Sequence, residues 1–144
     1  MATPLQILDT NILVHYVRDD LMWSQIRVEY QLLLVEPTPI ISIVSAGELR
    51  SLAQQWNWGR AKRDRMEFAL GYFRIVPLDT PEQVSIYAEI DNCCLARGRV
   101  MGKNDLWIAT TAALTDARLL TTDCDFDLLD TVFLNLELVR APES

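Results

Sequence analysis

A chain of 144 residues fits one ordinary domain with a single core, and we expect one domain over residues 1–144. Half of the residues are hydrophobic and 23% are charged, which excludes a disordered or low-complexity chain. The formal net charge of −7 argues against a nucleic-acid partner, because phosphate backbones are usually bound by basic surfaces.

Two local clusters of basic residues weaken that objection. Each is either a patch that contacts a polyanion or a solvated helix face, and the sequence leaves both interpretations open. Acidic residues that converge on bound divalent cations would also account for the negative total. The clusters are Arg60, Lys62, Arg63 and Arg65, and Arg97, Arg99 and Lys103.

The sequence shows no sign of a membrane or an export route. Apolar runs such as 31–35 and 40–44 are far shorter than the roughly 20 residues that a bilayer requires. The opening MATPLQILDTN lacks the basic segment, apolar stretch and cleavage site of a secretory signal. The odd set of Cys93, Cys94 and Cys124 lacks the spacing of a disulfide framework or a zinc site. We therefore expect no membrane segment and a cytoplasmic protein with reduced thiols.

Strands and helices alternate in the first half of the chain. Residues 4–9, PLQILD, predict a strand that ends in the polar DTN. A helix is expected at 25–35, and the apolar run IISIV at 40–44 predicts a strand covered on both faces. Apolar side chains at helical spacing predict a second helix at 45–57, and a third is expected at 60–71.

The alternation continues in the second half. A strand is predicted at 73–78, and the helix after it begins with a capping box of Thr80 and Gln83 and stops near Gly98. A helix from 105 onward carries a narrow face of small apolar residues. The last two strands are predicted at 117–122 and 136–140. This order predicts a three-layer α/β/α sandwich with a central parallel sheet of about five strands.

Acidic residues follow several of the predicted strands. Asp9 ends the first strand, Glu48 lies just after the second, and Asp123 follows the fourth. In parallel sheets, ligands bind outside the carboxyl ends of the strands. Asp105 opens the helix before the fourth strand, so it reaches the same edge only if that helix runs back across the sheet. We expect these four acids to form one cluster.

Structural interpretations compete for each acid taken singly. Asp9 suits the N-cap of the next helix, and Asp123 or Asp125 suits the cap of the segment after the fourth strand. Glu48 completes an S-x-x-E pattern with Ser45, which is typical of a capping box. The case for a shared site therefore depends on the acids together.

The position of Asp105 favours a shared site over separate structural roles for the acids. It lies on a helix face with Ile108, Ala109 and Ala112, where an unpaired charge is costly to bury unless a cation compensates it. Oxygen ligands in a chain whose single histidine is His15 suit Mg²⁺ or Mn²⁺ better than zinc or copper. Such ions activate water for phosphodiester hydrolysis, whereas a pair of glycosidase carboxylates would need a sugar cleft that a sequence does not reveal.

Four segments in order resemble the PIN-domain nucleases and, more narrowly, the VapC-type toxins of bacterial toxin–antitoxin pairs. The match covers nearly the whole chain, and its third segment is the most specific. The segments are LDTNILVHY (8–16), SAGELR (45–50), NDLWIATTAAL (104–114) and LLTTDCDF (119–126).

The resemblance implies a compact α/β/α domain with Mg²⁺- or Mn²⁺-dependent endoribonuclease activity on RNA. It also implies a homodimer and a cognate antitoxin protein that blocks the site. The positions that it implies as catalytic and metal-binding are Asp9, Glu48, Asp105 and Asp123.

Two polar positions beside the acids, Asn11 and Thr121, also match the family. Asp123 follows its strand more closely than Asp125 and is the favoured fourth acid, although the choice stays open. Large apolar residues near the first helices add a candidate surface for protein contacts, with core packing as the alternative for at least half of them. They are Leu21, Met22, Trp23, Trp56 and Trp58.

Rival interpretations fit less well. A phosphatase of the haloacid dehalogenase type needs a second Asp two residues after the first, where this chain has Asn11. A receiver-like signalling domain also gathers acids around Mg²⁺, but its spacing differs. From another class, a catalytically silent module that binds RNA or a protein stays open, and an RNA cleavage assay distinguishes it from an enzyme.

Overall fold

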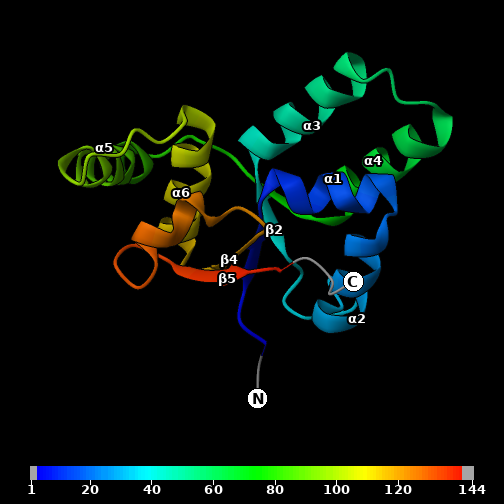
Figure 1. Ribbon diagram of the computed structural model, residues 1–144, viewed down its shortest axis with the longest axis horizontal. Coiled ribbons are helices and arrows are strands. Elements are labelled where there is room, and N and C mark those ends of the chain that lie inside the picture. The colour runs from blue at the N-terminus through cyan, green and yellow to red at the C-terminus, as the bar shows by residue number, and fades with distance from the viewer. Residues whose placement is uncertain (1–2, 141–144) are drawn as a thin grey trace.

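The structure, a computed structural model, describes residues 3–140 (Figure 1). Its strands are β1 Gln6–Leu8, β2 Ile40–Ser42, β3 Arg74–Val76, β4 Arg118–Thr121 and β5 Asn135–Leu138. Its helices are α1 Thr10–Arg18, α2 Leu21–Tyr30, α3 Ile43–Gln55, α4 Arg60–Tyr72, α5 Pro81–Ala96 and α6 Lys103–Thr115, with a 3₁₀ helix η1 at Cys124–Leu129. None of the helices in this part of the chain is long and apolar enough to cross a membrane.

The strands form one parallel sheet in the order β3-β2-β1-β4-β5. The chain first builds outward from β1 through β2 to β3, and then crosses to β4 on the other side of β1. The carboxyl ends of β1 and β4 therefore flank the point where the strand order reverses, which is where open α/β sheets bind ligands. The predicted parallel sheet of about five strands is confirmed.

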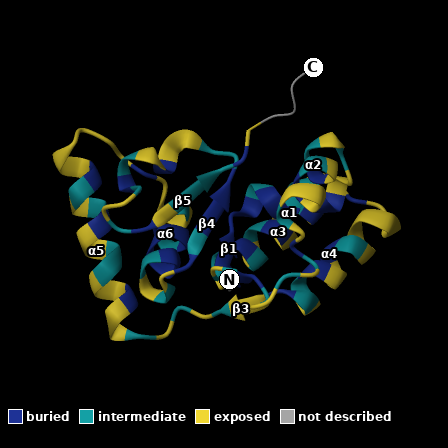
Figure 2. Ribbon diagram, turned by 90° about the horizontal axis from the view of Figure 1, so that it is seen from below, coloured by how far each residue is buried: buried dark blue, intermediate teal, exposed yellow. Residues whose placement is uncertain are grey.

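Helices cover both faces of the sheet, which confirms the α/β/α layers (Figures 1 and 2). Successive strand residues point to opposite faces, so Ile7 packs into one core and Leu8 into the other. Helices α1 to α4 complete the core around Leu8, and α5, α6 and η1 complete the core around Ile7. Because β1 is buried on both faces, the residue that follows it is held firmly at the sheet edge.

The boundary between β2 and α3 differs from the prediction. The strand expected at 40–44 ends at Ser42, and the helix expected at 45–57 begins at Ile43. The Ser42 hydroxyl accepts a hydrogen bond from the Val44 N–H at 3.1 Å, so Ser42 is the N-cap. The alternative interpretation of Ser45 and Glu48 as a capping box is therefore excluded, because the helix has already started before them.

The ends of two other helices also differ from the prediction. The helix predicted at 25–35 runs from Leu21 to Tyr30, because Asp20 caps its start through the Trp23 N–H and Gln31 adopts a left-handed conformation at its end. The helix predicted from 105 onward begins at Lys103. The capping box at the start of α5 is confirmed.

The five apolar residues singled out in the sequence divide between core and surface. Trp23 and Trp58 are buried, and Met22 packs partly against the same core. Leu21 and Trp56 are exposed to 80% and 48%. Two of the five thus remain as a candidate contact surface.

Candidate active site

Asp9 is the residue that follows β1 and the N-cap of α1. Its side chain is only 4% exposed, and Oδ1 accepts a hydrogen bond from the Thr10 N–H at 2.7 Å. Oδ2 accepts from the Thr121 hydroxyl at 2.6 Å and from the Asn11 amide at 3.2 Å. The capping role expected for Asp9 is therefore real, and it does not remove the carboxylate from the strand edge.

A polar network joins the ends of β1 and β4. The Thr121 Oγ1 that donates to Asp9 also accepts from the Asn11 amide at 3.3 Å and from the Asp123 N–H at 3.0 Å. The Asn11 Oδ1 accepts from the Thr122 N–H at 3.3 Å. Asn11 and Thr121 thus lie beside the acids, and they fix the backbone that carries Asp123.

Glu48 lies on α3 and faces Thr10 at the start of α1. The Thr10 Oγ1 donates to the Glu48 Oε1 at 2.7 Å and lies 3.0 Å from the Oγ of the buried Ser45. Sequence reasoning missed Thr10 and Ser45 as parts of the site. The signal for Thr10 was present, since it is the middle residue of DTN, but Ser45 looked like a helix cap.

Asp105 lies in the first turn of α6 and completes the cluster. It lines one cavity of about 350 Å³ with Asp9, Glu48 and Asp123. Helix α6 packs against both β2 and β4, so it does run back across the sheet as the placement required. No residue within 3–140 donates a hydrogen bond to the Asp105 carboxylate, in contrast to Asp9.

Burial and mutual repulsion change the acidity of two of the acids. Burial raises the pKa of Asp9 to about 6, against the lowering effect of the hydrogen bonds from Thr121 and Thr10. Burial also raises the pKa of Asp105 to about 6, and the neighbouring charges of Asp9, Asp123 and Glu48 add to the increase. A cation between these carboxylates would relieve the repulsion and favour their ionised forms.

The donor set fits a hard divalent cation. The ligand atoms offered are carboxylate oxygens, with hydroxyl and amide oxygens next to them, as Mg²⁺ and Mn²⁺ prefer. Within residues 3–140, the only three acidic, Cys or His side chains whose ligand atoms lie within 4.8 Å of one another are Asp123, Cys124 and Asp125. The four predicted acids therefore surround the cavity without converging on one point.

Asp123 and Asp125 face different spaces. Asp123 lines the cavity of Asp9, and its Oδ1 also caps η1 by accepting from the Asp125 N–H at 2.9 Å. Asp125 is exposed and lines a neighbouring cavity with Arg99. This placement favours Asp123 as the fourth acid.

Basic and aromatic side chains stand at the rim of the acidic cavity. Arg18 and Trp56 both line it, and the Arg18 guanidinium lies 5.0 Å from the centroid of the Trp56 ring. His15 also lines the cavity, with Nδ1 2.7 Å from the Asp20 Oδ2. Sequence reasoning missed Arg18 as part of the site, because it lies outside both basic clusters.

The two basic clusters are partly structural. Arg65 donates through Nε to the Tyr16 carbonyl at 2.8 Å and stacks on the Tyr16 ring. Arg97 and Arg99 each donate to a carbonyl oxygen of η1. The other members are exposed on the surface, and contact with RNA stays a prediction for both clusters. They are Arg60, Lys62, Arg63 and Lys103.

A parallel sheet with an acidic cavity at its switch point, where sheets of this kind bind ligands, defines the class of α/β protein. The family model of the PIN domain matches residues 7–132, and the chain belongs to this family. Members of the family are typically nucleases. No curated protein matches the chain in sequence.

Solved structures, one of them described as a member of a family of toxin–antitoxin systems, have a similar fold. VapBC2 from Rickettsia felis, bound to a promoter DNA fragment, gives a TM-score of 0.76 at 21% identity, covering 93% of this chain and 98% of that one. VapBC-5 from Mycobacterium tuberculosis, of the VapBC family of toxin–antitoxin systems, gives 0.70 at 21% identity, covering 96% and 100%. FitAcB from Neisseria gonorrhoeae gives 0.69 at 27% identity, covering 83% and 88%.

Proposed function

We propose that this protein is a Mg²⁺- or Mn²⁺-dependent endoribonuclease that acts as the toxin of a toxin–antitoxin pair. One observation carries the proposal. Four carboxylates from separate parts of the chain, Asp9, Glu48, Asp105 and Asp123, line a single cavity at the switch point of the sheet. Acids that were only structural would be paired with cations or spread over the surface, because gathered like charges repel one another.

Each acid has a role in the proposal. Asp9 and Asp105 hold the ion, directly or through water, and Glu48 binds it or orients the attacking water. Asp123 completes the site or holds a second ion. When bound, the ion lowers the pKa of water and stabilises charge on the phosphodiester undergoing displacement.

The polar neighbours orient these carboxylates. The Thr121 hydroxyl and the Asn11 amide fix Oδ2 of Asp9, and the Thr10 hydroxyl fixes Oε1 of Glu48. Donors aimed at one carboxylate oxygen hold the side chain in place and favour its ionised form. Arg18 at the rim supplies a positive charge that attracts the phosphate backbone of RNA to an otherwise acidic surface.

The partners are part of the same proposal. Two of the three solved structures are named as VapBC proteins, and one of these is described as a member of a toxin–antitoxin family. We propose that an antitoxin segment covers the acidic cavity and that two copies of this chain form a homodimer in the cytoplasm. A stable monomer in size-exclusion chromatography with light scattering would count against the dimer.

An RNA cleavage assay tests the enzymatic proposal. Asp9→Asn and Asp105→Asn should each lower the rate by at least about 100-fold, because each removes a ligand charge that acts on the reacting centre. Asp127→Asn is the matched control, since Asp127 is an exposed acid on the neighbouring η1. The control should keep the wild-type rate.

The same assay separates the proposal from the alternative of a silent binding module. Wild-type protein that binds RNA but never cuts it with Mg²⁺ or Mn²⁺ supports the silent module. A folded Asp9→Asn or Asp105→Asn variant with full activity overturns the assignment of the acids. Circular dichroism of each variant shows whether loss of activity comes from loss of fold.

A further inference from the structure

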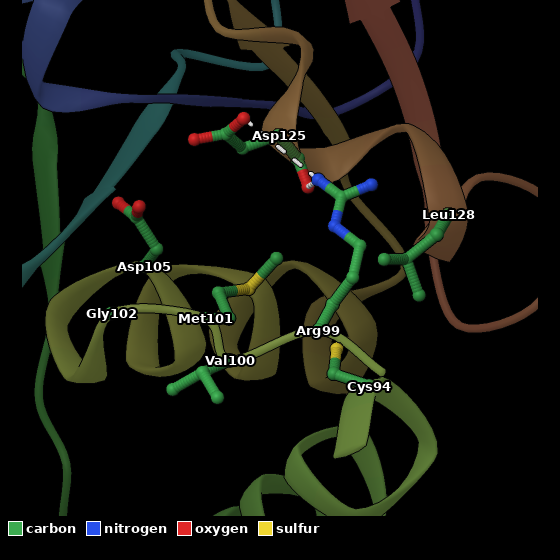
Figure 3. A pocket seen from close by; sticks show the side chains of 8 residues that line it. All are labelled: Cys94, Arg99, Val100, Met101, Gly102, Asp105, Asp125 and Leu128. Atoms are coloured by element: carbon green, nitrogen blue, oxygen red, sulfur yellow. Dashed lines mark hydrogen bonds and ion pairs between the residues drawn. The ribbon is translucent and has the colours of Figure 1, made fainter. Parts of the chain in front are cut away.

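A second cavity, of about 190 Å³, lies beside the acidic one, and apart from Asp105 none of its lining residues has a role in the proposed function (Figure 3). The two cavities share Asp105. Asp125 enters the second cavity from η1, opposite Asp105 on α6 (Figure 3). A group bound in this cavity would therefore lie next to the acid cluster.

The walls of this cavity combine an apolar surface with fixed polar groups. The apolar part is formed by Cys94, Val100, Met101 and Leu128, of which Cys94 and Met101 are largely buried. Arg99 forms the polar wall and is held to η1. Its Nη2 donates to the Asp125 carbonyl at 3.1 Å and lies 3.8 Å from the Asp125 Oδ1.

We propose that this cavity accepts one unstacked base of a single-stranded RNA substrate, from the nucleotide beside the scissile phosphate. The proposal rests on the proposed ribonuclease function. Single-stranded RNA is recognised through splayed bases that lie on apolar side chains or guanidinium planes and that hydrogen-bond at their edges. The cavity is smaller than the roughly 300 Å³ at which small-molecule pockets begin, so a single base suits it better than a larger ligand.

The polar groups favour guanine among the bases. Arg99 donates one of the two N–H groups of its Nη2 to the Asp125 carbonyl, which leaves the other edge of the guanidinium with two paired N–H donors for the O6 and N7 acceptors of guanine. The carboxylate of Asp125 is an acceptor for the N–H groups on the other edge of the same base. Uracil, cytosine and adenine each match only part of this pattern.

Short single-stranded RNAs that differ in one nucleotide at the cleavage site test this inference. Wild-type protein should prefer guanine there by about tenfold in kcat/KM, as one bidentate base contact provides. Arg99→Ala should remove the preference mainly by raising KM for the guanine substrate. The preference is overturned if wild type cuts all four RNAs alike.

Arg97→Ala is the matched control for the structural role of Arg99. The Arg97 Nη1 donates to the Leu128 carbonyl at 3.1 Å, so both arginines anchor η1, but Arg97 does not line the cavity. Arg97→Ala should keep the guanine preference. Equal loss of preference in both variants shows that only the anchoring of η1 matters and overturns the role of Arg99.

A binding measurement separates this inference from the proposed activity. Fluorescence anisotropy in EDTA, with the same RNAs, should show the guanine preference without any cleavage. If wild type never cuts RNA but keeps this preference, the nuclease proposal fails and the base site stands. If it cuts RNA without any preference in either assay, the base site fails alone.

A blocking variant covers the case in which Arg99→Ala does not fold. Val100 lines the cavity and is 86% exposed, so Val100→Trp should add bulk to the cavity wall without disturbing the core. It should abolish the guanine preference in both measurements. An unchanged RNA preference, with loss only of binding to a protein partner, assigns the cavity to that partner and overturns the inference.

Discussion

Asp9 and Asp105 reach the same cavity from two regions that treat a carboxylate differently. At the β1–β4 edge, Asp9 is almost fully buried and accepts hydrogen bonds from Thr10, Asn11 and Thr121. At the start of α6, Asp105 is half-buried and accepts none from residues 3–140. Yet burial raises the pKa of both to about 6.

This difference distinguishes an acid that stabilises the fold from an acid whose charge only a bound ligand would compensate. Asp9 caps α1 and closes a network between two strands, so the structure depends on it even without a ligand. The Asp105 carboxylate is repelled by the neighbouring acids and accepts no hydrogen bond from residues 3–140 that would compensate the repulsion. Its charge therefore destabilises the free protein. Side chains that destabilise the free fold are typical of functional sites.

The largest expected effect is a difference in the free energy of unfolding between variants of Asp9 and Asp105. Asp9→Ala should lower the free energy of unfolding by about 2 kcal/mol or more, because it leaves buried donors of Thr10 and Thr121 without an acceptor. Asp105→Ala removes no hydrogen bond and relieves charge repulsion, so it should not lower the free energy of unfolding. Urea unfolding in EDTA at pH 7 measures both. Equal losses in the two variants would contradict the comparison.

Much of the fold was predictable because buried parallel strands have a strong pattern. The apolar strand segments around Ile7, Ile41 and Leu119 were located correctly, and they are buried on both faces. The boundary between β2 and α3 was less predictable, because two nearby serines both suited the N-cap of α3. Ser45 matched the capping-box pattern with Glu48, but Ser42 capped α3 one turn earlier.

The acids at strand ends were easier to predict than the groups around them. Asp9 and Asp123 directly follow strands, whereas the place of Asp105 depended on how α6 packs across the sheet. No local pattern indicates that Thr10 reaches Glu48 or that Arg99 lines a second cavity. Such contacts join residues far apart in the chain and depend on tertiary packing.

The pH dependence of the free energy of unfolding shows whether the Asp105 charge destabilises the free protein. An acid whose folded pKa lies above its unfolded value binds more protons when folded, so stability falls as pH rises from about 3.8 through about 6. Asp105→Asn should therefore match wild type near pH 4. By pH 7 it should be more stable by about 1–2 kcal/mol, after allowance for solvent screening.

Urea unfolding in EDTA at several pH values measures this difference. The comparison between the two proteins cancels groups with the opposite trend, such as Asp20. Burial raises the pKa of Asp20, but the hydrogen bonds that it accepts from His15 and the Trp23 N–H outweigh this effect and lower it. Asp127→Asn serves again as control, and it should show no such pH dependence. A wild-type protein more stable than Asp105→Asn at pH 7 would show that the Asp105 charge is compensated.

The smallest expected effect is the stabilisation by a divalent cation. Under the proposed function, Mg²⁺ or Mn²⁺ at about ten times its dissociation constant should add about 1.4 kcal/mol to the free energy of unfolding. For a chain of this size, that raises the thermal midpoint by about 5 °C. Asp105→Asn should lose most of this rise, because one of the charges that attract the ion is gone.

A thermal midpoint that rises equally in both proteins would place the ion elsewhere. Ca²⁺ at equal ionic strength is the control that distinguishes binding at the site from general charge screening. Together with the pH series, this measurement asks whether the charge that destabilises the free protein is the one that binds the ion.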